Sequence, residues 1–189
     1  MRPLLVLIDR VAVTRRDHAH PAGRASLSVI VALAMAMLLA PFIGDKGQVL
    51  LAICLIGAAV AGFCFALEIA VRWSALLWSL ATAAAGIRVI FLGFYDSPAL
   101  LDVFLAAAGV QALALVVLSA PAWLASWRAR LPAILSLAGS AIVIVLILSP
   151  LTVEDVGQST LLAMLDLLAL PLAVLARRLA FTERMAAVA

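Results

Sequence analysis

Hydrophobic residues run along this chain in long blocks. Six blocks hold about 20 mostly apolar residues each, the length that an α-helix needs to cross the hydrocarbon core of a bilayer. They cover residues 26–44, 48–71, 73–94, 98–120, 131–151 and 159–179. Residues 141–148 show no in–out alternation of the β-barrel kind, and helices satisfy their own backbone hydrogen bonds in lipid. The sequence therefore predicts an all-α, polytopic integral membrane protein with a six-helix transmembrane bundle.

Turn-forming residues separate most of these blocks. Pro41, Gly44 and Gly47 lie in the first gap, residues 96–98 in the third, 121–132 in the fourth and 149–157 in the fifth. We predict a basic cytoplasmic tail over residues 1–25, the bundle over 26–179 and a cytoplasmic C-terminal tail over 180–189. The first tail is either an interfacial helix on the membrane surface or an irregular segment.

The composition supports a membrane protein. Of the 189 residues, 67% are hydrophobic and 12% are charged, and the mean hydropathy is +1.25. A typical globular domain is about 45–50% apolar and about 25% charged. These values exclude a soluble globular enzyme, a disordered chain and a protein that binds nucleic acid through a broad basic face. The lipid bilayer is the expected partner.

The basic residues predict the orientation. Eleven of the 13 fall on one side of the six predicted crossings: Arg2, Arg10, Arg15, Arg16, Arg24, Arg72, Arg128, Arg130, Arg177, Arg178 and Arg184. Positively charged segments stay in the cytoplasm. We therefore predict a multi-pass protein of the plasma (inner) membrane with both termini cytoplasmic. Trp73, Trp123 and Trp127 neighbour these arginines, as is typical of the membrane interface.

Asp166 is the most informative polar residue, because ionisable groups inside a membrane span usually have a partner or a function. It lies near the middle of the sixth block, five residues before Pro171, which removes a helix hydrogen bond. A carboxyl group at such a place suits a proton or cation site. The alternative is a protonated Asp166 that hydrogen-bonds to a neighbouring helix, with Gln111 on the fourth block as its partner.

Two ion pairs are also predicted. Arg88 and Asp102 are each seven residues from Tyr95, at a predicted hairpin turn, so they lie at about the same depth. They form either a structural latch or part of a substrate or ion path. Glu68 and Arg72 are four residues apart, which places them on one helix face as an interfacial pair.

Small residues recur every four positions at Ala32, Ala36 and Ala40 in the first block. Small residues at this spacing let helix backbones approach closely. This face either packs inside the bundle or docks another membrane subunit.

Signatures of catalysis are absent from the sequence. It contains no nucleophile elbow, Walker loop or His-Glu-x-x-His motif, and both histidines, His18 and His20, lie in the polar N-terminal tail. We therefore predict no catalytic residue, no metal and no cofactor, and the sequence favours a protein that is not an enzyme.

Three functions remain open. The first is a small-solute transporter, or the membrane subunit of a transport system, with Asp166, Arg88, Asp102 and Gln111 along the path. The second is a non-catalytic subunit or scaffold of a larger membrane complex. The third is an enzyme that acts on a lipid substrate. A transporter requires water to reach Asp166, whereas a scaffold keeps this residue dry.

Overall fold

The computed structural model describes residues 21–67, 72–90, 98–148 and 156–188, and every regular element in these ranges is helical. The α-helices are α2 (Pro21–Ala36), α3 (Gly47–Ala66), α4 (Arg72–Ile90), α5 (Pro98–Trp123), α6 (Trp127–Leu148) and α7 (Val156–Val188). Two 3-10 turns, η1 (Met37–Phe42) and η2 (Gly44–Lys46), connect α2 to α3. The prediction of an all-helical chain is confirmed for these residues.

Four helical segments in the described ranges are long and apolar enough to cross a membrane. They are Gly23–Phe42, Gly47–Ala66, Ala106–Trp123 and Thr160–Ala187. The bundle also exposes large apolar side chains, such as Leu39 at 59%, Leu80 at 67% and Leu113 at 64% of their surface. Apolar surface of this extent is unfavourable in water and normal against lipid. These features define a helical membrane protein.

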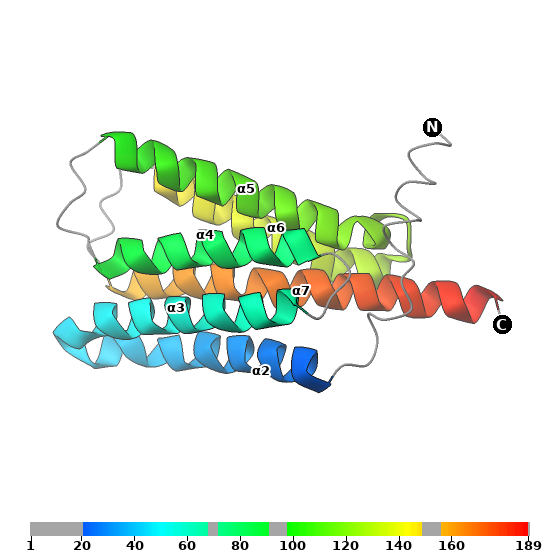
Figure 1. The fold of residues 1–189 in the computed structure, drawn as a ribbon, viewed down its shortest axis with the longest axis horizontal. Helices are drawn as coiled ribbons and strands as arrows, with labels where there is room; N and C mark the ends of the chain where they lie inside the picture. The colour runs from blue at the N-terminus through cyan, green and yellow to red at the C-terminus, as the bar shows by residue number, and fades with distance from the viewer. Residues whose placement is uncertain (1–20, 68–71, 91–97, 149–155, 189) are drawn as a thin grey trace.

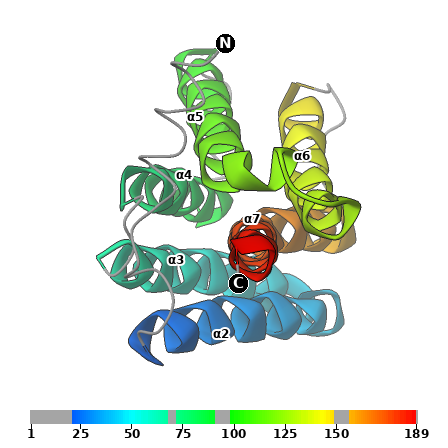
Figure 2. The same ribbon diagram turned by 90° about the vertical axis from the view of Figure 1, so that its right-hand side faces the viewer.

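Helix α7 forms the centre of the bundle. Successive helices run in opposite directions, so the start of α2 and the end of α7 lie at the same end (Figure 1). Figure 2 looks onto that end and shows α7 inside an arc made by α2, α3, α4, α5 and α6. Helix α7 contacts all five of them. A polar side chain in the middle of α7 therefore has protein on several sides.

One end of the bundle is rich in exposed basic side chains. It is the end where α2, α4 and α6 begin and where α3, α5 and α7 finish (Figure 1). Exposed arginines lie there at Arg24, Arg72, Arg128 and Arg130. We call it the basic end.

The first predicted crossing changes helix type part of the way along. From Met37 the chain adopts 3-10 geometry, with about 3.0 residues per turn in place of 3.6. The three regularly spaced alanines differ in burial: Ala32 is exposed and Ala36 half-buried in α2, and Ala40, after the change of helix type, is fully buried. They do not form one exposed strip. Docking of another subunit at this face stays a prediction.

One predicted connection and the C-terminal segment are largely helical in the structure. The segment expected to link the fourth and fifth crossings, residues 121–132, is mostly helical, because α5 continues through Pro121 and α6 contains Pro132. Proline fixes a helical φ and is tolerated in membrane helices whose neighbours satisfy the freed groups. In addition, the predicted C-terminal tail continues α7 as helix to Val188. The 33 residues of α7 span about 50 Å, more than the hydrocarbon thickness of about 30 Å.

Candidate functional site

The candidate site is a polar cluster around Asp166 on α7. Asp166 is 4% exposed. Among the buried side chains that the structure describes, it is the one acidic or basic residue. Nε2 of Gln111 on α5 donates a hydrogen bond to its Oδ1. Oγ1 of Thr82 on α4 donates a longer bond, of 3.4 Å, to its Oδ2. We call Asp166, Gln111 and Thr82 the polar cluster.

The polar cluster joins three helices across an apolar core. Leu115, Leu167 and Leu170 lie near it along α5 and α7, and all three are 0% exposed. A carboxyl group in such surroundings is strongly unfavourable without hydrogen-bond partners. Gln111 and Thr82 supply those partners to both carboxyl oxygens, so the contact between Gln111 and Asp166 that the sequence suggested is present.

Few other titratable groups approach the cluster in the described residues. The thiol of Cys54 on α3 is buried in the same core. The described charged side chains of α2, η2, α4 and α6 are exposed and lie at or near helix ends: Arg24, Lys46, Arg72, Arg128 and Arg130. Within the described ranges, no three His, Cys, Asp or Glu side chains gather as they would around a metal. The cluster itself offers oxygen atoms from one carboxyl, one amide and one hydroxyl group.

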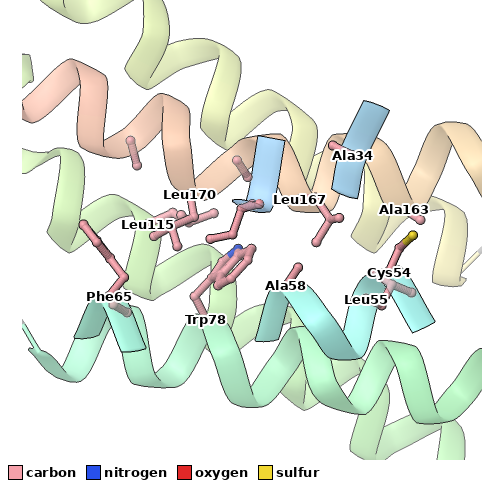
Figure 3. Packing of buried hydrophobic residues seen from close by; sticks show 14 of the residues in the cluster. Ala34, Cys54, Leu55, Ala58, Phe65, Trp78, Leu115, Ala163, Leu167 and Leu170 are labelled. Carbon is pink, nitrogen blue, oxygen red and sulfur yellow. The ribbon is translucent and has the colours of Figure 1, made fainter. Parts of the chain in front are cut away.

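Trp78 lies one helical turn from Thr82 on α4. Its side chain is 0% exposed, and its Nε1 has no hydrogen-bond partner in the described part of the chain. A buried donor without a partner costs about 1–3 kcal/mol. Figure 3 shows the nitrogen edge of the indole turned toward the part of α7 that carries Leu167 and Leu170. Trp78 thus brings an unsatisfied donor close to the polar cluster.

Gly62 on α3 packs closely against the indole of Trp78. A methyl group at Gly62 would lie 2.6 Å from Cζ3 of Trp78 and 2.6 Å from Oγ of Ser79. Both distances are far below ordinary van der Waals separation. The position of the indole therefore depends on the absence of a side chain at Gly62.

Helices α6 and α7 pack through small residues. Oγ of Ser136 donates a 2.7 Å hydrogen bond to the carbonyl of Ala169, two residues before Pro171. Nearer the basic end, alanines of α6 and α7 pack together with Ala122 of α5: Ala129, Ala133, Ala176 and Ala180. This close packing holds α7 on both sides of its proline.

Glu183 anchors the protruding part of α7. Its carboxylate accepts hydrogen bonds from the backbone N–H of Ser126, at 2.9 Å, and from the Ser126 hydroxyl. Ser126 immediately precedes α6, and its Oγ accepts a 3.2 Å bond from the N–H of Arg128. An acidic group beside a helix N-terminus is favourable. We call this contact the Glu183 clamp.

The residues of the two predicted ion pairs are not all described. Arg88 and Asp102 belong to the helical backbone of α4 and α5, but their side chains lie outside the described residues. Glu68 also lies outside them, and its predicted partner Arg72 is exposed. Both ion pairs therefore stay predictions.

Two residues of the site were missing from the sequence interpretation. Thr82 lies near the middle of the third predicted crossing, as Asp166 does in the sixth, so a search for polar residues at equal depth could have found it. Trp78 gave no such signal, because tryptophan in a membrane protein is typical of the interface.

Comparison with known proteins gives no relative: no protein family, no curated protein and no solved structure matches the chain. The class of the protein therefore rests on its own features. It is an all-helical membrane protein with a carboxyl-centred polar cluster on its central helix.

Proposed function

We propose that the protein is a small-solute transporter, or the membrane subunit of a transport system, in which Asp166 binds and releases a proton. The observation that carries this proposal is the polar cluster. A carboxyl group lies on the helix that contacts all the others, and it is held by one amide and one hydroxyl. Ionisable residues in such positions mark substrate and ion paths or proton relays.

Gln111 suits both protonation states of Asp166. Its amide has N–H donors and a carbonyl acceptor. Facing the ionised carboxylate, the amide donates, as it does in this structure. Facing protonated Asp166, the amide turned over presents its carbonyl to the new O–H group. The hydroxyl of Thr82 also donates or accepts. A proton can thus be added or removed without leaving a buried polar atom unpaired.

Transport at this site requires a second conformation, because Asp166 is enclosed in this one. Pro171 lies five residues further along α7 and removes one backbone hydrogen bond from that helix. Helices bend most easily at such points. Bending of α7 near Pro171 would change the contacts of Asp166 with α4 and α5.

The proposed topology has six crossings, with both termini in the cytoplasm and the protein in the inner membrane. The lengths of α4 and α6 support it: 19 and 22 residues correspond to about 28 and 33 Å, close to the hydrocarbon thickness of about 30 Å. Exposed Trp73 (77%) and Trp127 (69%) accompany the arginines of the basic end. Arginines at the membrane boundary are typical of the cytoplasmic side, and exposed tryptophans are typical of a membrane interface.

Carbodiimide labelling tests the protonation of Asp166. Dicyclohexylcarbodiimide modifies protonated carboxyl groups in apolar surroundings, and mass spectrometry locates the product. In liposomes containing the full chain, we expect labelling of Asp166 to fall as the bath is made more alkaline. Asp166→Asn should remove the labelled site, whereas Ser136→Ala, a buried polar change on α6, should leave labelling unchanged. Labelling that ignores bath pH contradicts the proposal.

The substrate can be sought with the same reaction. A solute that binds beside Asp166 should slow or speed its labelling, so small solutes can be screened by their effect on the rate. A solute that changes the rate should also be taken up by liposomes with the unaltered chain, and not by those with Asp166→Asn.

A second candidate function is a non-catalytic subunit of a larger membrane complex. The observation in its favour is that both oxygens of enclosed Asp166 are already hydrogen-bonded, as a structural latch requires. This function predicts a stoichiometric partner after purification in mild detergent. It also predicts that Asp166→Asn, which keeps size and hydrogen bonding, retains partner and activity.

A further inference from the structure

The indole N–H of Trp78 indicates a bound acceptor near the polar cluster. Trp78 is fully buried, and its Nε1 has no partner within the described residues. It lies four residues from Thr82, which is about 6 Å along the helix axis. Buried donors are almost always hydrogen-bonded, to protein or to ordered water.

The carbonyl of Leu167 on α7 is the candidate acceptor for the Trp78 N–H. Pro171 has no N–H, so the carbonyl of Leu167 lacks the donor that a helix normally supplies to it. Leu167 directly follows Asp166, and the nitrogen edge of Trp78 is turned toward this part of α7 (Figure 3). A buried donor without a partner and a carbonyl without its helix donor are groups of the kind that a buried water joins.

The buried polar residues of α4 and α5 lie on one side of the cluster. Toward the basic end these helices carry buried Ser74, Ser79 and Ser119 as well as Trp78. Ser74 is eight residues from Thr82, and Ser119 is eight residues from Gln111, each about 12 Å along its helix. In the other direction, residues 83–87 and 106–110 are all alanine, glycine, isoleucine or valine, and beyond them lie Arg88 and Asp102, whose side chains are outside the described residues. The buried polar residues described in the opposite half include Thr160 on α7 and Ser140 on α6.

We propose that water reaches Asp166 from the basic end, and that the Trp78 N–H and the Leu167 carbonyl hold one water molecule beside the cluster. The inference rests on the proposed protonation of Asp166 and adds the side from which the proton comes. On release, the proton passes from the carboxyl group to this water and onward to the basic end. The carboxylate that remains is held by Gln111 and Thr82. Leu115 and Leu170 are fully buried along the proposed route in this structure. The route therefore conducts a proton when these side chains move.

Exchange of the indole proton tests the water site. In the full chain labelled with ¹⁵N-tryptophan in detergent micelles, the Trp78 signal is assigned by its loss in Trp78→Phe. We expect this N–H to exchange with deuterated solvent within minutes although the side chain is buried. Pro171→Ala restores a donor to the Leu167 carbonyl and should slow exchange about tenfold. A Trp78 signal that persists for hours overturns the water site, and unchanged exchange in Pro171→Ala overturns the carbonyl as its second anchor.

Side-specific thiol labelling tests the direction. Single cysteines are introduced at Ser74, Ser119 or Thr160 in a chain whose Cys54 and Cys64 are replaced by alanine. A charged, membrane-impermeant methanethiosulfonate is added to one side of sealed vesicles. We expect Ser74→Cys and Ser119→Cys to react from the basic end, and Thr160→Cys to stay unreactive from the opposite side. Reaction of Thr160→Cys from that side, or silence at both serine positions, overturns the route.

The outcome for the route is separate from that for the proposed function. If carbodiimide labelling of Asp166 depends on bath pH while Trp78 does not exchange, Asp166 binds protons and this route is wrong. If labelling ignores bath pH, protonation of Asp166 fails whatever Trp78 does.

Discussion

Gly62→Ala is a direct test of the packing behind Trp78. The added methyl group would meet the rigid indole of Trp78 at 2.6 Å and the Ser79 hydroxyl at 2.6 Å. Because Trp78 is 0% exposed, the ring has no solvent-facing space to move into. Overpacking of this kind costs about 1–3 kcal/mol, and alanine recovers at most about 1 kcal/mol of helix propensity over glycine. We expect a net loss of up to about 2 kcal/mol.

Gly109→Ala on α5 is the matched control. Nothing lies within 4 Å of the methyl group that this substitution would add. The change should therefore leave stability unaltered or raise it by up to about 1 kcal/mol. Both variants can be compared by titration with sodium dodecyl sulfate in mild-detergent micelles, followed by circular dichroism. If Gly62→Ala proves as stable as Gly109→Ala, the contact between α3 and α4 described above is wrong.

Three further predictions concern other contacts. Ser136→Ala removes the bond between α6 and α7 and should reduce stability by about 0.6 kcal/mol, and by no more than about 1.7 kcal/mol, in the same titration. Glu183→Gln weakens the clamp on Ser126, so hydrogen exchange should quicken in the last turns of α7 and not in its centre; uniform exchange would argue against the clamp. In detergent micelles, a membrane-permeant maleimide should modify Cys64, at the surface of α3, faster than buried Cys54, and equal rates would contradict the packing of α3.

The sequence predicts the helices well because the length of an apolar block is a direct physical requirement of the membrane. It predicts the ends less well. The connection that the sequence marked between Pro121 and Pro132 is shorter than predicted, because α5 continues through Pro121 to Trp123 and α6 begins at Trp127, before Pro132. Likewise, Ala40 continues the spacing of Ala32 and Ala36 in the sequence, but the 3-10 turn from Met37 changes its direction.

The candidate site could be predicted in part. Asp166 was visible because a carboxyl group is rare in an apolar block, and Gln111 because few neighbours could pair with it. Thr82 did not stand out in the sequence, because a hydroxyl in a membrane helix commonly bonds to the backbone of its own helix, as Ser79 and Ser119 do here. The burial of Trp78 depends on how α4 is rotated against α7, which block lengths alone do not determine.

The energetics of the polar cluster bear on whether it exists for stability. Two hydrogen bonds between membrane helices contribute about 1.2 kcal/mol together, whereas an aspartate at the centre of a membrane helix costs about 2.5–3.5 kcal/mol. The two hydrogen bonds therefore do not offset the cost of placing the aspartate in the membrane. A function explains the polar cluster better than stability does. Asp166→Asn keeps the size and both hydrogen-bond positions but removes the ionised form, so it should be at least as stable as the unaltered chain in the detergent titration. A loss of several kcal/mol would contradict this reasoning, because it would show that the ionised carboxylate itself stabilises the bundle.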